Sequence, residues 1–346
     1  MTSSDGTPGR GRFSVSPAAR YREMRANRTI YVLALLALLA PWVLWLQQLQ
    51  VAFAFPGLPG GPSAQEFLRE QLLTFGEGTP LQTFDLFVAA ALGVALFSHD
   101  RGAGGLLFSL EGPLSRREVW LAKLLFGSAI LILVRVLGTA ANLAAAAASG
   151  NLDLWSTLLL NALAGVTGQL MFFATALAMG GAMATAFVLL ATLLWMGLPG
   201  LLQGLGMILW PAAPLHPWIL ALANFSPFQP FQASMFGGGS AVIRIAWFLV
   251  WTAAMVWLGA RWWDRAAYER LNDGFFFPFL WNLYYAFLSL VSGLIVTTVI
   301  TRGQILGLGW AAIYAAFFVA GWFFWRWVVT LRGRWGHLRE PWTGRP

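Results

Sequence analysis

Long apolar runs separated by short polar segments occupy most of the chain. Runs of about 20 mostly apolar residues begin near positions 29 and 81 and recur to about position 329. An α-helix rises 1.5 Å per residue, so each run can cross about 30 Å of hydrocarbon. The pattern predicts an all-α polytopic membrane protein.

The runs predict eight spans, at residues 29–48, 81–98, 115–148, 154–179, 183–199, 241–262, 278–300 and 305–329. The third is about 50 Å long by the helical rise, so its first turns should project beyond the membrane. Two shorter apolar segments, 201–210 and 218–225, are bounded by proline and glycine. Their length favours re-entrant segments between spans five and six over further spans.

Three regions follow from this pattern. Residues 1–15 are rich in Gly, Ser and Arg and are expected to be a disordered basic terminus. Residues 16–262 form the transmembrane core, which begins with a short interfacial helix whose first position is Pro17. Residues 263–346 comprise a polar link, a two-span hairpin and a basic tail.

The charges indicate the orientation of the chain. Only 10% of residues are charged, against about a quarter in soluble domains, and the net charge is +8. With eight spans, the basic groups at 10–28, 101–123, 261–270 and 326–345 all face one side, and only Arg69, Arg244 and Arg302 face the other. Cytoplasmic loops carry such an excess, so both termini should lie in the cytoplasm. The chain itself is expected in the cell membrane. The basicity is then topological, and nucleic-acid binding is not expected.

The stretch "EGPLSRREVWLAKLL", residues 111–125, has an unusual start-of-helix signal. Pro113 disfavours helix before it, and Ser115 followed by Glu118 is a capping box, in which each side chain satisfies a backbone N–H. Arg116 and Arg117 lie just inside the cap, and the stem of Lys123 is expected to snorkel. The stretch therefore predicts a sharp turn and a rigid helix entering the membrane.

The longer segment "DRGAGGLLFSLEGPLSRREVWLAKLL" resembles the region between the second and third spans of ABC-2-type transporter permeases. The matching positions are Asp100, Gly102, Leu106, Leu107, Pro113, Leu114, Ser115, Arg116 and Lys123. In that family this region holds the coupling helix that contacts a separate ATPase subunit. Glu111, Arg117 and Glu118 lie in the same segment and join the candidate coupling residues.

The resemblance implies an ABC-2-like six-helix core, an ATP-driven transporter and, most simply, an exporter. Two features depart from the family pattern: Glu111 and Gly112 are inserted before the proline, and two spans follow the core. The chain has no GxxxxGK[ST] phosphate loop, so ATP and Mg²⁺ should bind in the partner. Two ATPase subunits and a second permease, identical or paralogous, are implied. The apolar composition leans towards an amphipathic or lipid-like substrate.

Two ionisable residues lie within predicted spans. Asp85 and Arg135 are on sequential helices, both about 7 Å outward of the membrane midplane by the helical rise. A charge at this depth is costly, so a pair is expected, either as an interhelical tie or as a gate. The remaining alternative is that Asp85 simply reaches the outer interface. Asn161, Thr167 and Gln169 could form interhelical hydrogen bonds or line a polar route.

Two other functions remain open at this point. A gradient-driven secondary transporter would use Asp85 as its proton carrier. A membrane-embedded enzyme is disfavoured because His99, His216 and His337 lie in different loops without clustered carboxylates. The same scatter gives no reason to expect a metal site, and the absence of cysteine excludes thiolate catalysis and disulfides.

Overall fold

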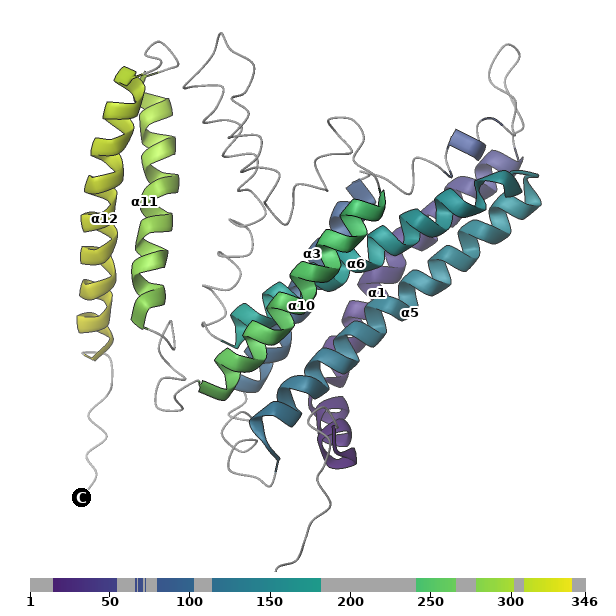
Figure 1. Cartoon of the computed structure of the whole chain (residues 1–346), viewed down its shortest axis with the longest axis horizontal. Coiled ribbons are helices and arrows are strands. Elements are labelled where there is room, and N and C mark those ends of the chain that lie inside the picture. Colours follow the sequence, from purple (N-terminus) through teal and green to yellow (C-terminus); the bar gives the residue numbers. More distant parts are fainter. Residues whose placement is uncertain are drawn as a thin grey trace, which may run out of the picture. The chain divides into compact units, whose positions relative to one another are not determined.

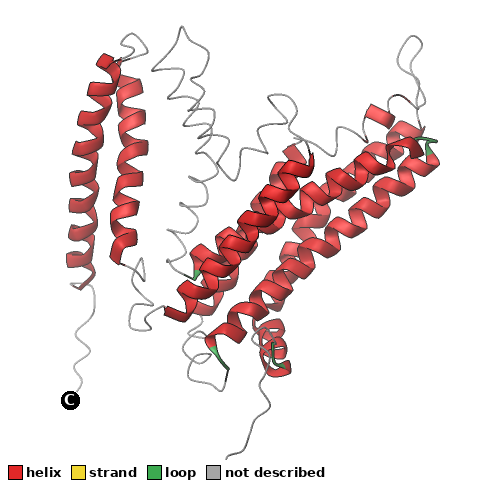
Figure 2. Ribbon diagram, in the orientation of Figure 1, coloured by secondary structure: helices red, strands yellow, loops and turns green. Residues whose placement is uncertain are grey.

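The structure is a computed structural model that describes residues 15–54, 66, 68–70, 72, 80–102, 114–181, 241–265, 278–301 and 308–337. Within these residues every regular element is a helix (Figure 2). In chain order they are α1 (Pro17–Ala54), α3 (Pro80–Gly102), α5 (Arg116–Ala148), the 3₁₀ turn η1 (Leu152–Leu154), α6 (Trp155–Gly180), α10 (Ala241–Arg265), α11 (Pro278–Thr301) and α12 (Leu308–His337). The all-α prediction is confirmed.

Several of these helices can cross a membrane. Among the described residues five are long and apolar enough, within the ranges Pro17–Gln47, Arg116–Ala148, Leu152–Gly180, Val242–Arg265 and Gly309–Val328, and α3 holds a shorter apolar stretch, Phe84–His99. The chain is therefore a multi-pass membrane protein. The predicted fifth span and the re-entrant segments fall in 182–240, outside the described residues, so the count of eight spans stays a prediction.

The described helices form two compact units: α1, α3, α5, η1, α6 and α10 in one, α11 and α12 in the other. In the first, α6 packs against α3, α5 and α10, and α1 packs against α3 and α5 (Figure 1). The second half of α6 is almost entirely buried, including Met171, Phe173 and Leu177. This helix is the centre of the bundle.

Glycine sets the spacing of the central helices. A Cβ on Gly93 of α3 would lie 2.8 Å from the backbone oxygen of Phe173 on α6. Backbone cannot rotate away as a side chain can, so the contact between α3 and α6 requires glycine at this position. On the other side of α6, a Cβ on Gly259 of α10 would lie 2.9 Å from the Cβ of Ala178. Both α3 and α10 therefore approach α6 closely.

The N-terminal helix differs from its prediction. A separate short helix was expected before the first span, but α1 runs without interruption from Pro17 to Ala54. No glycine or proline occurs between Pro17 and Pro41, so nothing in the sequence breaks the helix there. The first turns of α1 are consequently a rigid extension of the span.

The second unit is a hairpin of α11 and α12, which lie side by side in Figure 1. A Cβ on Gly293 would lie 3.3 Å from the backbone nitrogen of Phe318, so the two helices approach closely there. The Trp325 indole N–H donates to the Ser292 hydroxyl at 3.2 Å across the same contact. Small residues and polar side chains of this kind are what join helices within lipid.

Candidate functional site

The start of α5 has the predicted capping box. The Glu118 N–H donates to Ser115 Oγ at 3.2 Å, and the Ser115 N–H donates to Glu118 Oε2 at 3.0 Å. Ser115 has the extended backbone typical of an N-cap, with φ −71° and ψ 148°. Two of the backbone donors that a helix start leaves unpaired are thus satisfied, which holds the first turn in place.

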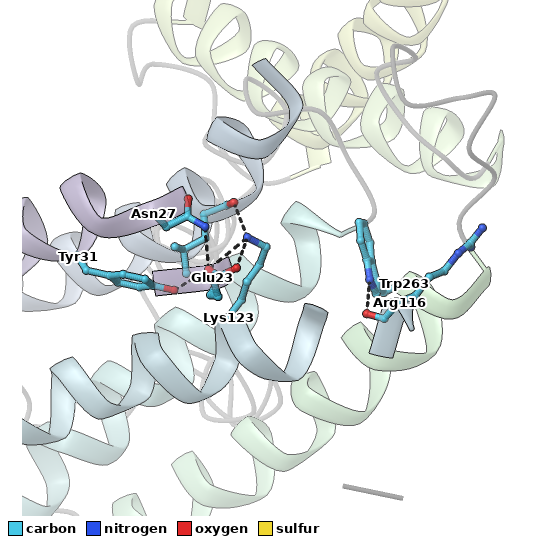
Figure 3. A network of polar contacts seen from close by, with 7 residues as sticks. Glu23, Asn27, Tyr31, Arg116, Lys123 and Trp263 are labelled. Atoms are coloured by element: carbon cyan, nitrogen blue, oxygen red, sulfur yellow. Dashed lines mark hydrogen bonds and ion pairs between the residues drawn. The ribbon is translucent and has the colours of Figure 1, made fainter. Parts of the chain in front are cut away.

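The first turn of α5 is also joined to the end of α10. The Arg116 guanidinium donates to the backbone carbonyl of Asp264 at 3.2 Å. The indole N–H of buried Trp263 donates to the Arg116 carbonyl at 2.8 Å (Figure 3). Asp264 is next to last among the described residues of α10, so its carbonyl lies at the negative end of the helix dipole. The cationic side chain of Arg116 suits this position.

Trp263 extends this contact to α3. Its ring centroid lies 4.8 Å from that of Phe97, and both side chains are almost fully buried. The end of α10, the start of α5 and the last turns of α3 therefore meet at one end of the bundle.

Lys123 lies deeper in the same region, and its snorkelling prediction is wrong. The side chain has no solvent exposure. Its ammonium donates to Glu23 Oε2 at 3.1 Å and to the backbone carbonyl of Leu96 at 3.0 Å, and it lies 5.5 Å from the centre of the Phe97 ring. Lys123 thus joins α5 to α1 and α3 instead of reaching the membrane surface.

Glu23 is the partner that the sequence analysis missed. Its Oε1 accepts a hydrogen bond from the Asn27 amide at 2.8 Å and another from the Tyr31 hydroxyl at 2.7 Å (Figure 3). The signal available in the sequence is the spacing of Glu23, Asn27 and Tyr31 by four residues, which places them on one stripe of a helix. Arginines flank Glu23, and a helix with alternating charges is usually exposed to solvent. A buried carboxylate was therefore not predicted in this segment.

The remaining candidate coupling residues are described only in part. Asp100 and Gly102 belong to the last turn of α3, although their side-chain environment is not described. Leu114, Arg117 and Glu118 are partly exposed, and Ser115 is exposed, at the start of α5. The predictions for Leu106, Leu107, Glu111 and Pro113 fall outside the described residues.

The structure also brings Asp85 and Arg135 together. Arg135 Nη1 lies 4.0 Å from Asp85 Oδ2, and both side chains are almost fully buried. The Gln169 amide donates to the same Asp85 oxygen at 3.3 Å. The three residues link α3, α5 and α6.

Arg135 has further contacts that no pairing argument predicts. It donates to the backbone carbonyls of Asn161 and Ala162 at 3.3 and 3.4 Å, and its guanidinium lies 5.6 Å from the centre of the Trp42 ring. A Cβ on Gly165 would lie 1.9 Å from Arg135 Nη2, so glycine leaves the room that the guanidinium occupies. These contacts are those of an interhelical tie, and opening of the pair as a gate stays a prediction. Thr167, by contrast, donates to a carbonyl of its own helix.

The chain matches the sequence model of one protein family. Residues 21–268, well over half of the chain, match the model described as ABC-2 family transporter protein. The matched segment begins in α1, ends just after α10 and leaves out α11 and α12. Searches of curated proteins and of solved structures gave no match. The start of α5, which carries the resemblance seen in the sequence, lies inside the matched segment, and the chain belongs to the ABC-2 family of transporter membrane proteins.

Proposed function

We propose that this chain is the permease subunit of an ATP-driven exporter and that residues 99–118 receive the motion of a separate ATPase subunit. The observation that carries this proposal is the construction of the start of α5. Its first turn is capped by Ser115 and Glu118 and joined to α10 through Arg116. A force that the ATPase applies to the segment before α5 would therefore displace α5 and α10 and would not unwind the first turn of α5.

The complete transporter has four subunits in this proposal. Two ATPase subunits bind ATP and Mg²⁺, and two permeases, identical or paralogous, enclose the substrate route between them. Both termini and the 99–118 segment face the cytoplasm in this proposal, as the excess of basic residues on that side suggests. The family match supports the ABC ATPase as partner.

Co-purification tests the proposal. The wild-type chain, Arg117→Glu and the control Arg261→Glu are purified from native membranes in mild detergent, and their partners are identified by mass spectrometry. Arg117 is chosen because it is partly exposed at the start of α5, whereas Arg116 donates to the Asp264 carbonyl of α10. Arg261 is exposed and near the end of α10. Placing a like or unpaired charge at an interface should reduce the bound ATPase about tenfold in Arg117→Glu alone.

The other outcomes are equally informative. If all three samples retain a stoichiometric ATPase, the transporter stands and the contact lies elsewhere, for example at residues 268–274 of the polar link between the core and the hairpin. If the wild-type sample contains no ATPase, the proposed function fails. The gradient-driven carrier then becomes the leading reading, and Asp85→Asn alone should abolish its transport.

A further inference from the structure

The first turns of α1 face the bundle with polar side chains. Glu23 and Asn27 are buried there, whereas Tyr21 and Met24, on other faces of the same turns, are 69% and 45% exposed. This arrangement reverses the usual one, because burying a charge or an amide is unfavourable unless it is paired. The contact between α1 and the rest of the bundle at this end therefore depends on the partners of Glu23.

Those partners hold Glu23 firmly. Its two carboxylate oxygens accept from the Lys123 ammonium, the Asn27 amide and the Tyr31 hydroxyl at 2.7–3.4 Å. The Glu23 side chain is 5% exposed and that of Lys123 is fully buried. Water screens such a pair little, so the two charges cannot be drawn apart without leaving a buried charge uncompensated. The contact resists separation of α1 from α5.

The position of the pair matters as much as its strength. Lys123 lies roughly 12 Å along α5 from Ser115 by the helical rise. The Leu96 carbonyl, to which it also donates, is in the last two turns of α3. The segment between α3 and α5 is the proposed ATPase contact. Lys123 consequently joins both helices that flank this contact to a third helix, α1.

We propose that Glu23 and Lys123 are positioning residues that make the N-terminal turns of α1 move together with the flanking ends of α3 and α5 during the ATP cycle. The inference rests on the proposed function and deepens it, because it adds α1 to the coupling machinery. Neither residue contacts the ATPase in this scheme. Asn27 and Tyr31 keep the Glu23 carboxylate directed at Lys123.

The first test neutralises the pair without leaving a lone charge. In Glu23→Gln/Lys123→Met the new amide keeps an oxygen that can accept from Asn27 and Tyr31. The matched control is Arg69→Gln/Asp153→Asn, which removes an exposed ion pair of 2.8 Å elsewhere in the same unit. Each chain is reconstituted in lipid vesicles with the co-purified ATPase.

The readouts are the kcat and KM of ATP hydrolysis and the thermal stability of the complex. In the neutral variant, kcat should fall about three- to 30-fold towards the value of the ATPase without permease, the range expected for a residue along a coupling network. The KM for ATP and the amount of bound ATPase should not change. The control should match the wild type in all four quantities.

A second measurement uses the cysteine-free sequence, in which introduced thiols are the only ones. Spin labels are attached at Tyr21→Cys on α1 and Leu125→Cys on α5, both exposed positions. With the pair intact, the distance between the labels should be the same without nucleotide and with a slowly hydrolysed ATP analogue. In the neutral variant the analogue should shift or broaden that distance.

The outcomes separate the two proposals. A wild-type complex in which the labels move apart with nucleotide overturns the inference, whether or not the neutral variant folds. So does a folded neutral variant with wild-type kcat and distances. If the wild-type chain binds no ATPase at all, the proposed function has failed and the inference with it. A selective loss of kcat together with nucleotide-dependent label motion in the variant supports the inference.

Discussion

A buried charge requires a partner, and at Lys123 that requirement joins two positions 100 residues apart. Lys123 is the chain's one lysine, and its compact ammonium donates to a carboxylate and a carbonyl at the same time. The planar guanidinium of arginine suits bidentate contacts instead, as Arg135 illustrates by donating to two consecutive carbonyls. The two cations are therefore used for different geometries in one bundle.

Breaking the pair from one side should destabilise the protein strongly. Lys123→Met leaves Glu23 buried without a countercharge, which is expected to cost about 3–5 kcal/mol. Thermal unfolding in detergent, followed by tryptophan fluorescence, should show a clearly lower Tm for this variant. The double change Glu23→Gln/Lys123→Met should regain most of the loss. Equal stability of Lys123→Met and the wild type would mean that Glu23 is not buried as a charge.

At the scale of elements, α5 connects the candidate ATPase contact to the interior of the membrane. Its 33 residues correspond to about 50 Å of helix, more than one bilayer requires. One end carries the capping box and the contact with α10, and Arg135 ties the helix to α3 and α6 further along. A displacement at the start of α5 can thus reach the middle of the bundle without passing through a loop.

Removing the cap should loosen only this end of α5. Ser115→Ala deletes the acceptor for the Glu118 N–H, at an expected cost of about 1 kcal/mol. Hydrogen exchange measured by mass spectrometry should become faster for the amides of residues 116–119. Ser149→Ala, at the opposite end of the helix, is the control and should leave these amides unaffected. Unchanged exchange in Ser115→Ala would show that the contact with α10 alone holds the first turn.

At the scale of the whole molecule, the family match ends between the described helices of the two units. Its last residue, 268, follows α10 of the first unit and precedes α11 of the second. The α11–α12 hairpin has its own helix contacts, which include Gly293 and Ser292. A domain carries its own packed interior. The hairpin therefore has the properties of an addition to a core that is complete without it.

A chain shortened to residues 1–274 should therefore fold. It is expected to accumulate in membranes, to unfold at a temperature close to that of the full chain, and to co-purify with the same ATPase. Size-exclusion chromatography in detergent and the thermal unfolding assay check this. Matched chains that end at residue 240, which lack α10 and so the contacts with Arg116, should not fold. Aggregation of the 1–274 chain would show that the hairpin completes the core.

Much of this architecture could be predicted from local patterns. The apolar runs at 115–148 and 241–262 agree with α5 and α10 to within three residues, and the capping box is confirmed atom by atom. The sequence also indicated that Asp85 and Arg135 lie at similar depth. Glu23 could not be identified in this way, because a carboxylate among arginines is a common pattern on solvated helices. The continuity of α1 was not predicted either, because its charged first turns and its apolar run were assigned to separate helices.

The sequence by itself determined which segments are helical, that they cross a membrane, and to which family the coupling segment is similar. These properties depend on hydrophobicity and on capping, which act over a few neighbouring residues. The tertiary structure decided which helix faces carry buried charges, that Lys123 meets Glu23, and that Gly165 makes room for Arg135. Such contacts depend on how helices rotate and approach one another, and that is settled by the packing of all of them together.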